Sequence, residues 1–332
     1  MWNSIGHQST LAFFEHAQSL GHLAHAYLLT GPAQVGKRTL ALALGQALLC
    51  INEAAIPPGS PCGTCHACLK AQNGTHPDLR IIRPAEGKKA LGIDEIRVLI
   101  GAAALQPQEG RYSIFVLPRA EMLTTEAANA LLKTLEEPPP QTILFLTATD
   151  EQLLPATVIS RCQVMPLGLV NTREISAALV ERQGISQERA RELSVLAAGR
   201  PGWAIAASQN PELQAQRAAW FELMETLCAS GPAQRMKIGA ALARDTEQLN
   251  ELLMVWLSWW REVLFSLEGI PPSERLSHYA RQTRPDVARQ VIRQIHEAAQ
   301  QLEQNAQPRL VLEMLLLELP PMKAASEQHS RA

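Results

Sequence analysis

The stretch LLTGPAQVGKRTLALAL, residues 28–44, decides the fold of the first half of the chain. Gly31, Gly36 and Lys37 have the spacing G-x-x-x-x-G-K, in which backbone N–H groups at the start of a helix surround phosphates and the lysine neutralises them. The apolar run at residues 26–30 predicts a strand before this loop, and the leucines and alanines after it predict a helix. This order predicts a parallel α/β sheet with a phosphate-binding loop (P-loop).

The same loop lacks the residue that holds magnesium in nucleotide hydrolases. A Ser or Thr is needed directly after the lysine, and Arg38 stands there. Thr39 follows one residue later, about 100° further around the helix, where its hydroxyl reaches a metal only after a backbone shift. A second metal-site group is also missing, because the apolar run 113–117 ends in Pro118-Arg119, where hydrolases carry acidic residues. We therefore expect no ATP hydrolysis at this site.

Two interpretations of the degenerate P-loop stay open at this point. Gly31, Gly36, Lys37 and Thr39 either bind ATP or ADP without hydrolysing it, or the loop only turns the chain between a strand and a helix. The motif spacing alone does not decide between a nucleotide site and a structural turn.

Apolar runs and helix signals outline the rest of the architecture. Short runs rich in Ile, Val, Leu and Phe predict buried parallel strands, with helices between them, at residues 26–30, 79–83, 113–117 and 142–148. No strand is expected after Arg161. Two helices that begin at N-cap residues and end near glycine are expected there instead, at 171–184 and 186–202. An all-helical tail is expected to open at Asn210-Pro211, with its final helix at 308–319.

These patterns predict three domains. They are an α/β core at residues 1–165, a small helical domain at 166–208 and an all-helical domain at 209–332. A chain of 332 residues is long enough for more than one hydrophobic core.

Four cysteines lie close together in the sequence, with the spacing C-x11-C-x2-C-x2-C at Cys50, Cys62, Cys65 and Cys68. Four thiolates can close a tetrahedral structural zinc site, and the Pro- and Gly-rich segment before the second cysteine lets the chain turn back. Disulfides are disfavoured in the cytosol, whereas an iron–sulfur cluster stays open as an alternative. The spacing therefore predicts a structural metal site, with zinc as the expected ion.

Two further segments carry candidate functional side chains. LTTEAANALLKTLEEPPPQT, residues 123–142, predicts an amphipathic helix that begins after the N-cap Thr124 and stops at Pro138. VISRCQV, residues 158–164, follows about a dozen residues after the last predicted strand. Arg161 in it either pairs with a carboxylate of its own chain or reaches the nucleotide of a neighbouring subunit as an arginine finger.

Composition and charge narrow the classes of protein that fit. Hydrophobic residues make up 46% and charged residues 19% of the chain, which is typical of a soluble globular protein. The net charge of −2 argues against a protein that coats nucleic acid. The N-terminal residues lack the basic and apolar regions of a signal peptide, and the apolar stretch 252–260 is too short to span a membrane. We expect a cytoplasmic protein with no membrane partner.

Together these segments resemble the delta-prime subunits of bacterial DNA polymerase III, which belong to the clamp-loader branch of the AAA+ proteins. The resemblance is carried by AHAYLLTGPAQVGKRT (24–39), the four-cysteine module (50–68), NALLKTLEEPP (129–139), SRC (160–162) and NAQPRLVLEMLLLEL (305–319). NALLKTLEEPP followed by SRC is the most specific part, and the five segments extend over most of the chain.

The resemblance implies a fold, a set of partners and two sites. It implies an AAA+ core with an inserted zinc module, a helical lid and a C-terminal helical collar that joins subunits into a hetero-pentamer with delta and gamma or tau motor subunits. That complex loads a sliding clamp on primed DNA. It further implies zinc at the four cysteines, and that Arg161 serves the ATP site of the adjacent motor.

The departures at Arg38 and Pro118-Arg119 fit a subunit that does not hydrolyse ATP. The alternatives are an active gamma- or tau-type ATPase motor, and a zinc-dependent DNA binder. The cysteine module lacks the interleaved basic helix that such a DNA binder needs.

Overall fold

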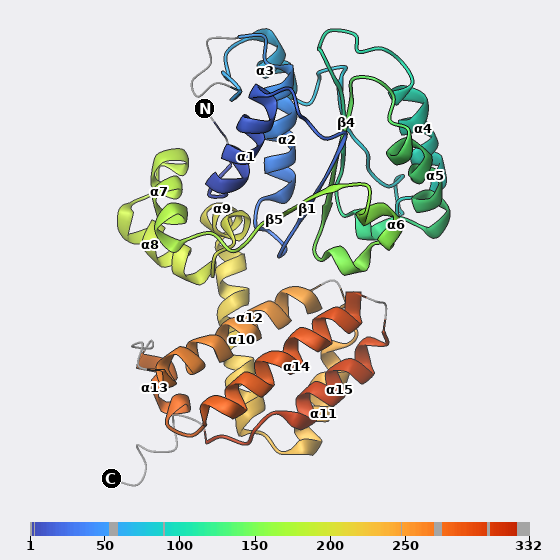
Figure 1. Cartoon of the computed structure of the whole chain (residues 1–332). Coiled ribbons are helices and arrows are strands. Elements are labelled where there is room, and N and C mark those ends of the chain that lie inside the picture. The colour runs from blue at the N-terminus through green and yellow to red at the C-terminus, as the bar shows by residue number, and fades with distance from the viewer. Residues whose placement is uncertain are drawn as a thin grey trace. The chain divides into compact units, whose positions relative to one another are not determined.

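The computed structural model describes residues 2, 4–52, 59–88, 90–246, 248–268, 274–303 and 306–323. The chain forms two compact units, Met1–Ser208 and Gln209–Ala332. The first unit contains a parallel sheet with helices on both faces, and the described part of the second contains helices (Figure 1). The division of the first unit into core and lid stays a prediction.

Five parallel strands form the sheet of the first unit, in the order β2-β3-β4-β1-β5. Their bounds are β1 Ala26–Thr30, β2 Leu79–Ile81, β3 Ser113–Leu117, β4 Thr142–Ala148 and β5 Gln163–Pro166. The strands predicted at 26–30, 113–117 and 142–148 are confirmed, and the one predicted at 79–83 begins as expected and ends two residues early. The predicted α/β P-loop fold class is confirmed.

The expectation that no strand follows Arg161 is wrong. β5 pairs with β1 in parallel, with Tyr27 opposite Gln163 and Thr30 opposite Pro166. This strand has only four residues and lies at the edge of the sheet, where Gln163 is exposed and Met165 is its one buried residue. A short edge strand of this kind lacks the apolar run by which the other strands were predicted.

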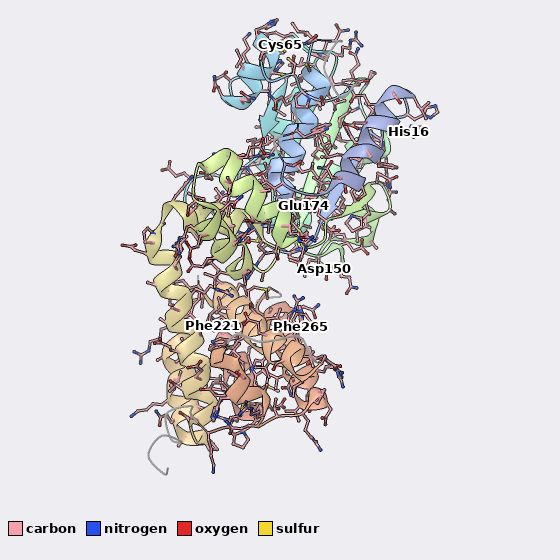
Figure 2. The ribbon with its side chains drawn as sticks, turned by 90° about the vertical axis from the view of Figure 1, so that its left-hand side faces the viewer. His16, Cys65, Asp150, Glu174, Phe221 and Phe265 are labelled. Carbon is pink, nitrogen blue, oxygen red and sulfur yellow. The ribbon has the colours of Figure 1, made fainter. Side chains whose placement is uncertain are left out.

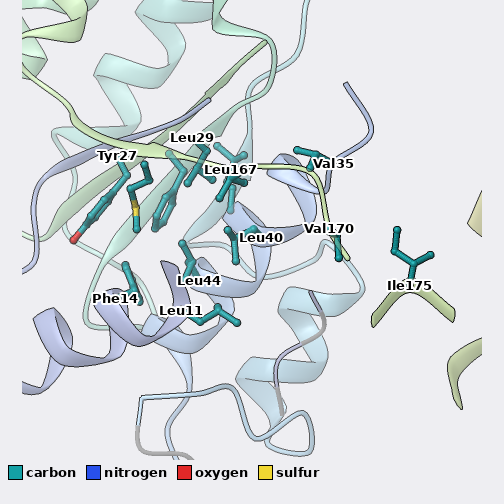
Figure 3. Packing of buried hydrophobic residues seen from close by; sticks show 14 of the residues in the cluster. Leu11, Phe14, Tyr27, Leu29, Val35, Leu40, Leu44, Leu167, Val170 and Ile175 are labelled. Carbon is teal, nitrogen blue, oxygen red and sulfur yellow. The ribbon is translucent and has the colours of Figure 1, made fainter. Parts of the chain in front are cut away.

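Alternate residues of β1 serve two different cores. Tyr27 and Leu29 pack with α1 (Gln8–Ser19) and α2 (Lys37–Leu49), where Figure 3 shows them near Phe14 and Leu44. Leu28 faces the other side, in a cluster with residues of α4 (Ile93–Ala103) and α5 (Thr125–Glu136). The two-residue period of a strand thus places α2 and α5 on opposite faces of the sheet.

Caps fix the helix starts that the sequence predicts. The Thr124 hydroxyl accepts the backbone N–H of Ala127 at the start of α5, and Asn171 and Ser186 cap α7 (Thr172–Gln183) and α8 (Gln187–Leu196) in the same way. The other helical elements of this unit are α3 His66–Gln72, η1 Ala120–Met122, η2 Glu151–Leu153, α6 Ala156–Ile159 and α9 Pro201–Gln209.

The second unit has a helical core of its own. Its helices are α10 Pro211–Ala229, α11 Pro232–Leu242, α12 Leu249–Leu267, α13 Glu274–Ala280, α14 Pro285–Glu303 and α15 Pro308–Glu318. The core is dominated by Trp256, Trp259 and Trp260 of α12, which are fully buried. Among the described residues, no helix has the length and apolar character that crossing a bilayer requires.

Candidate functional site

The two glycines of the P-loop are required for different physical reasons. Gly31 follows β1 with a φ of 139°, and a Cβ at this position would lie 2.1 Å from the carbonyl oxygen of Leu167. Gly36 is the N-cap of α2 with a φ of 108°, a backbone conformation that L side chains rarely adopt. The loop thus has the strand-to-helix path that the motif predicts, with the N-terminus of α2 at its end.

Lys37 folds back onto its own loop. Its Nζ donates hydrogen bonds to the carbonyl oxygens of Gly31, at 2.5 Å, and of Pro32, at 2.7 Å. The ammonium group therefore donates its hydrogen bonds to backbone carbonyl oxygens, whereas in a nucleotide site a phosphate would accept them. Arg38 and Thr39, the next two residues of α2, are exposed.

Two segments outside the motif also hold the loop, and no sequence motif marks either contact. The backbone N–H of Gly202, in α9, donates to the carbonyl oxygen of Gln34 at 2.9 Å. A Cβ on Gly202 would lie 2.9 Å from that same oxygen, so the close approach needs a glycine. The His7 ring nitrogen Nε2 lies 3.0 Å from the carbonyl oxygen of Val35.

The end of β3 carries no carboxylate, as the sequence indicates. Arg119 occupies the left-handed region with a φ of 55°, its N–H donates to Thr147 Oγ1 at 3.1 Å, and its Nη2 lies 3.6 Å from Met122 Sδ. Glu121, the nearest acidic residue, lies in η1 beyond the strand, with Oε1 3.5 Å from Thr149 Oγ1.

The four cysteines predicted to bind metal lie together. The Sγ atoms of Cys50, Cys62, Cys65 and Cys68 all lie within 4.8 Å of one another. Cys50 directly follows α2, Cys65 is the N-cap of α3, where Figure 2 labels it, and Cys68 lies inside α3. Residues 53–58, between the first and second cysteines, lie outside the described residues.

Hydrogen bonds pre-arrange this cysteine cluster. The backbone N–H of Cys65 donates to Cys62 Sγ at 3.3 Å and lowers the pKa of that thiol to about 5. Cys68 is fully buried, and burial raises the pKa of its thiol. The side-chain amide of Gln46 in α2 donates to the Cys68 carbonyl oxygen at 3.0 Å, which ties α3 to α2. Four convergent sulfur atoms form a donor set that can hold a metal ion.

Arg161 lies between α6 and β5, with its side chain 33% exposed. Its Nη2 lies 2.7 Å from Oε1 of Glu136, the last residue of α5, and its Nη1 donates to the carbonyl oxygen of Thr157 at 2.8 Å. The structure therefore brings the SRC segment and the NALLKTLEEPP helix together. In the isolated chain the arginine has the intrachain carboxylate partner that the sequence left as one alternative.

Arg161 and the P-loop lie at opposite ends of the same pair of strands. β1 and β5 run in the same direction, the P-loop follows the end of β1, and Arg161 precedes the start of β5. The four paired residues between them span about 10 Å. Arg161 also faces α5, whereas the P-loop leads into α2 on the other face of the sheet. Its guanidinium group is therefore directed away from the chain's own P-loop.

Asp78 organises a loop beside the cysteine cluster, and no motif marked it. Its carboxylate accepts the backbone N–H groups of Gln108, Glu109 and Gly110 at 2.7–2.8 Å. The Glu109 carboxylate pairs with Lys70 of α3 at 2.7 Å, so the loop is linked to the segment that carries Cys68. Burial alone raises the pKa of Asp78, but the three N–H donors outweigh burial and hold the pKa below its usual value.

We expect Asp78→Asn to lower the free energy of unfolding by about 2 kcal/mol at neutral pH, because an amide offers one acceptor oxygen where the carboxylate uses two. A folded-state pKa below the unfolded one gives stability that is present above about pH 4 and lost as the pH falls through the folded pKa. Urea unfolding followed by circular dichroism at several pH values measures this difference. Asp94→Asn, at an exposed carboxylate, is the control. Equal stabilities at pH 7 would contradict the prediction.

Comparisons with known proteins match the region of the chain that contains these sites. A family model described as "DNA polymerase III, delta subunit" matches residues 6–170. The "DNA polymerase III subunit delta'" of Pseudomonas aeruginosa is 40% identical over 54% of this chain and 54% of its own length. The Escherichia coli protein of the same name is 36% identical over 63% of this chain and 58% of its own length.

The "DNA polymerase III subunit tau" of Escherichia coli is 35% identical over 52% of this chain, but over only 26% of its own length. The alignments with the two delta-prime subunits span a little more than half the length of those relatives. The matched region contains the P-loop, the cysteine cluster and Arg161. Over residues 6–170 the chain is therefore similar to the DNA polymerase III delta family, and its relatives include delta-prime subunits.

Proposed function

We propose that this chain is the delta-prime-type subunit of a DNA polymerase III clamp loader in DNA replication, and that Arg161 acts as an arginine finger on the ATP of a neighbouring subunit. The observation that supports this most is the place of Arg161, which is partly exposed and lies at the opposite end of the β1–β5 pair from its own P-loop. A guanidinium group there can stabilise phosphoryl-transfer charge only on a nucleotide that another chain holds.

The chain itself does not hydrolyse ATP in this proposal. Arg38 replaces the hydroxyl that binds magnesium, and Pro118-Arg119 replaces the acidic residues at the end of β3. Lys37 donates to two carbonyl oxygens of its own loop. In this proposal Gly31, Gly36, Lys37 and Thr39 have a structural role. The alternative of an active gamma- or tau-type motor rests only on the spacing of Gly31, Gly36 and Lys37.

The partners follow from the family. The relatives are named as subunits of DNA polymerase III, so we place this chain beside gamma or tau motor subunits and delta in a cytoplasmic hetero-pentamer. That complex would act on the sliding clamp and primed DNA. The second unit would serve as the collar that joins the subunits.

The metal in the cysteine cluster is zinc in this proposal. Four sulfur ligands with no open position suit a closed, structural Zn²⁺ site. The ion would join the end of α2 to α3 and would take no part in chemistry.

The test compares the isolated chain with the reconstituted complex. We expect the purified chain to show no Mg²⁺-dependent ATP turnover, alone or with primed DNA and clamp. Adding the chain to motor subunits and delta should raise the rate at which the motors hydrolyse ATP, because Arg161 would then act as an arginine finger at the adjacent motor. Turnover by the isolated chain that disappears in Lys37→Ala would show a motor instead.

A further inference from the structure

Glu136 is the side chain that holds the guanidinium group of Arg161. It ends α5, while Arg161 comes 25 positions later, between α6 and β5. Leu135 of α5 and Val158 of α6 are buried in the same cluster, so packing fixes the backbones that carry the two charged groups. The ion pair, with 2.7 Å between Nη2 and Oε1, therefore connects two rigid segments.

The ion pair does little for stability. Glu136 is 49% exposed and Arg161 is 33% exposed, and exposed pairs of this kind contribute little because water screens them. A carboxylate at the last residue of a helix also meets the negative end of the helix dipole, which disfavours it locally. The stability of α5 thus gives no reason for an acidic residue at position 136. The ion pair with Arg161 does give a reason.

We propose that Glu136 is a positioning residue for Arg161, which it holds in the orientation that meets the phosphates of a neighbouring nucleotide. This inference rests on the proposed function, because it needs Arg161 to act on another subunit's ATP. Glu136 itself touches no nucleotide in this proposal.

Two fixed points set the plane of the guanidinium group. Nη2 meets the Glu136 carboxylate, and Nη1 meets the carbonyl oxygen of Thr157 and, at 3.2 Å, the Ser160 hydroxyl. A guanidinium is a rigid planar fork with five N–H donors, so two fixed nitrogens leave the remaining donors with a defined direction. An arginine without the carboxylate would lose that orientation and would have to be ordered anew in each catalytic cycle.

The experiment measures ATP turnover by the reconstituted complex that contains Glu136→Ala. We expect kcat to fall by about ten- to a hundredfold, which is the cost of loosening an oriented group, and KM for ATP to stay unchanged. Glu136→Gln keeps an acceptor oxygen without the charge, so its kcat should lie between those of the wild type and the alanine variant. The melting temperature of the isolated Glu136→Ala chain should change by less than about 3 °C.

Glu137→Ala is the matched control, because Glu137 is the next residue and is exposed, and it has no ion pair with any residue that the structure describes. It should leave kcat unchanged. Arg161→Ala and the double variant Arg161→Ala/Glu136→Ala should be equally slow, because Glu136 acts only through the arginine.

The outcomes separate this inference from the proposed function. If Arg161→Ala is slow but Glu136→Ala turns over ATP as fast as the wild type, or faster, the positioning role is wrong and the finger role stands. Additive losses in the double variant would also overturn the positioning role. If Arg161→Ala is as fast as the wild type, both proposals fail.

Discussion

We expect Arg161→Ala to lower ATP hydrolysis by the reconstituted clamp loader about 10³-fold at the site that this chain completes. In the proposed finger role, the guanidinium group would neutralise charge that develops on the transferring phosphoryl group, and alanine would leave that charge in place. Single-turnover hydrolysis with a complex in which only one motor can hydrolyse ATP measures the loss at that site. Arg161→Lys should recover little, because an ammonium group lacks the planar fork.

Assembly provides the control for this first prediction. Arg161→Ala should enter the complex as efficiently as the wild type in size-exclusion chromatography, because the side chain of Arg161 is partly exposed and its contacts are local. Arg173→Ala, at an exposed arginine in the first turn of α7, should leave turnover unchanged. Wild-type hydrolysis by the Arg161→Ala complex would rule out the finger role.

The second large effect concerns the cysteine cluster. We expect one zinc ion per chain by elemental analysis, and loss of that ion in Cys68→Ser, because the buried sulfur is replaced by an oxygen that stays protonated. Structural zinc sites carry apparent binding free energies of about 10–16 kcal/mol in peptides, so the segment around α3 should unfold with the ion. Limited proteolysis should then cut within residues 59–76.

Cys228→Ser is the matched control for the zinc prediction. Cys228 is also buried, but it lies in α10 beside Met224, in the other unit. This variant should keep its zinc and resist proteolysis near α3. Iron with inorganic sulfide in the wild-type protein would contradict the zinc assignment and favour the cluster that the spacing also allows.

Much of the first unit was predictable because its signals are local. The spacing of Gly31, Gly36 and Lys37 fixes a strand-to-helix turn within a dozen residues, and the cap at Thr124 fixes the start of α5. β5 was missed for the opposite reason. Its residues QVMP gain strand geometry from pairing with β1, a tertiary contact that leaves no period in the sequence.

The candidate sites divide in the same way. The C-x-x-C spacing keeps Cys62, Cys65 and Cys68 on one short segment, and Cys50 joins them from the end of α2. The pairing of Glu136 with Arg161, the three N–H donors around Asp78 and the contact of Gly202 with Gln34 join segments that are remote in sequence. Such contacts depend on how helices and strands pack against one another. Local patterns in one sequence do not predict this packing.

The inward fold of Lys37 has a consequence for any triphosphate that enters the loop. Such a ligand would have to replace the carbonyl oxygens of Gly31 and Pro32 as the acceptors of Lys37. The electrostatic gain is then the strength of the new contact between ammonium and phosphate minus that of the lost contacts with the two carbonyl oxygens. Restoring a serine at position 38 would add a metal ligand yet leave that exchange in force. A single reversion of the motif would therefore leave the contacts of Lys37 with its own loop unchanged.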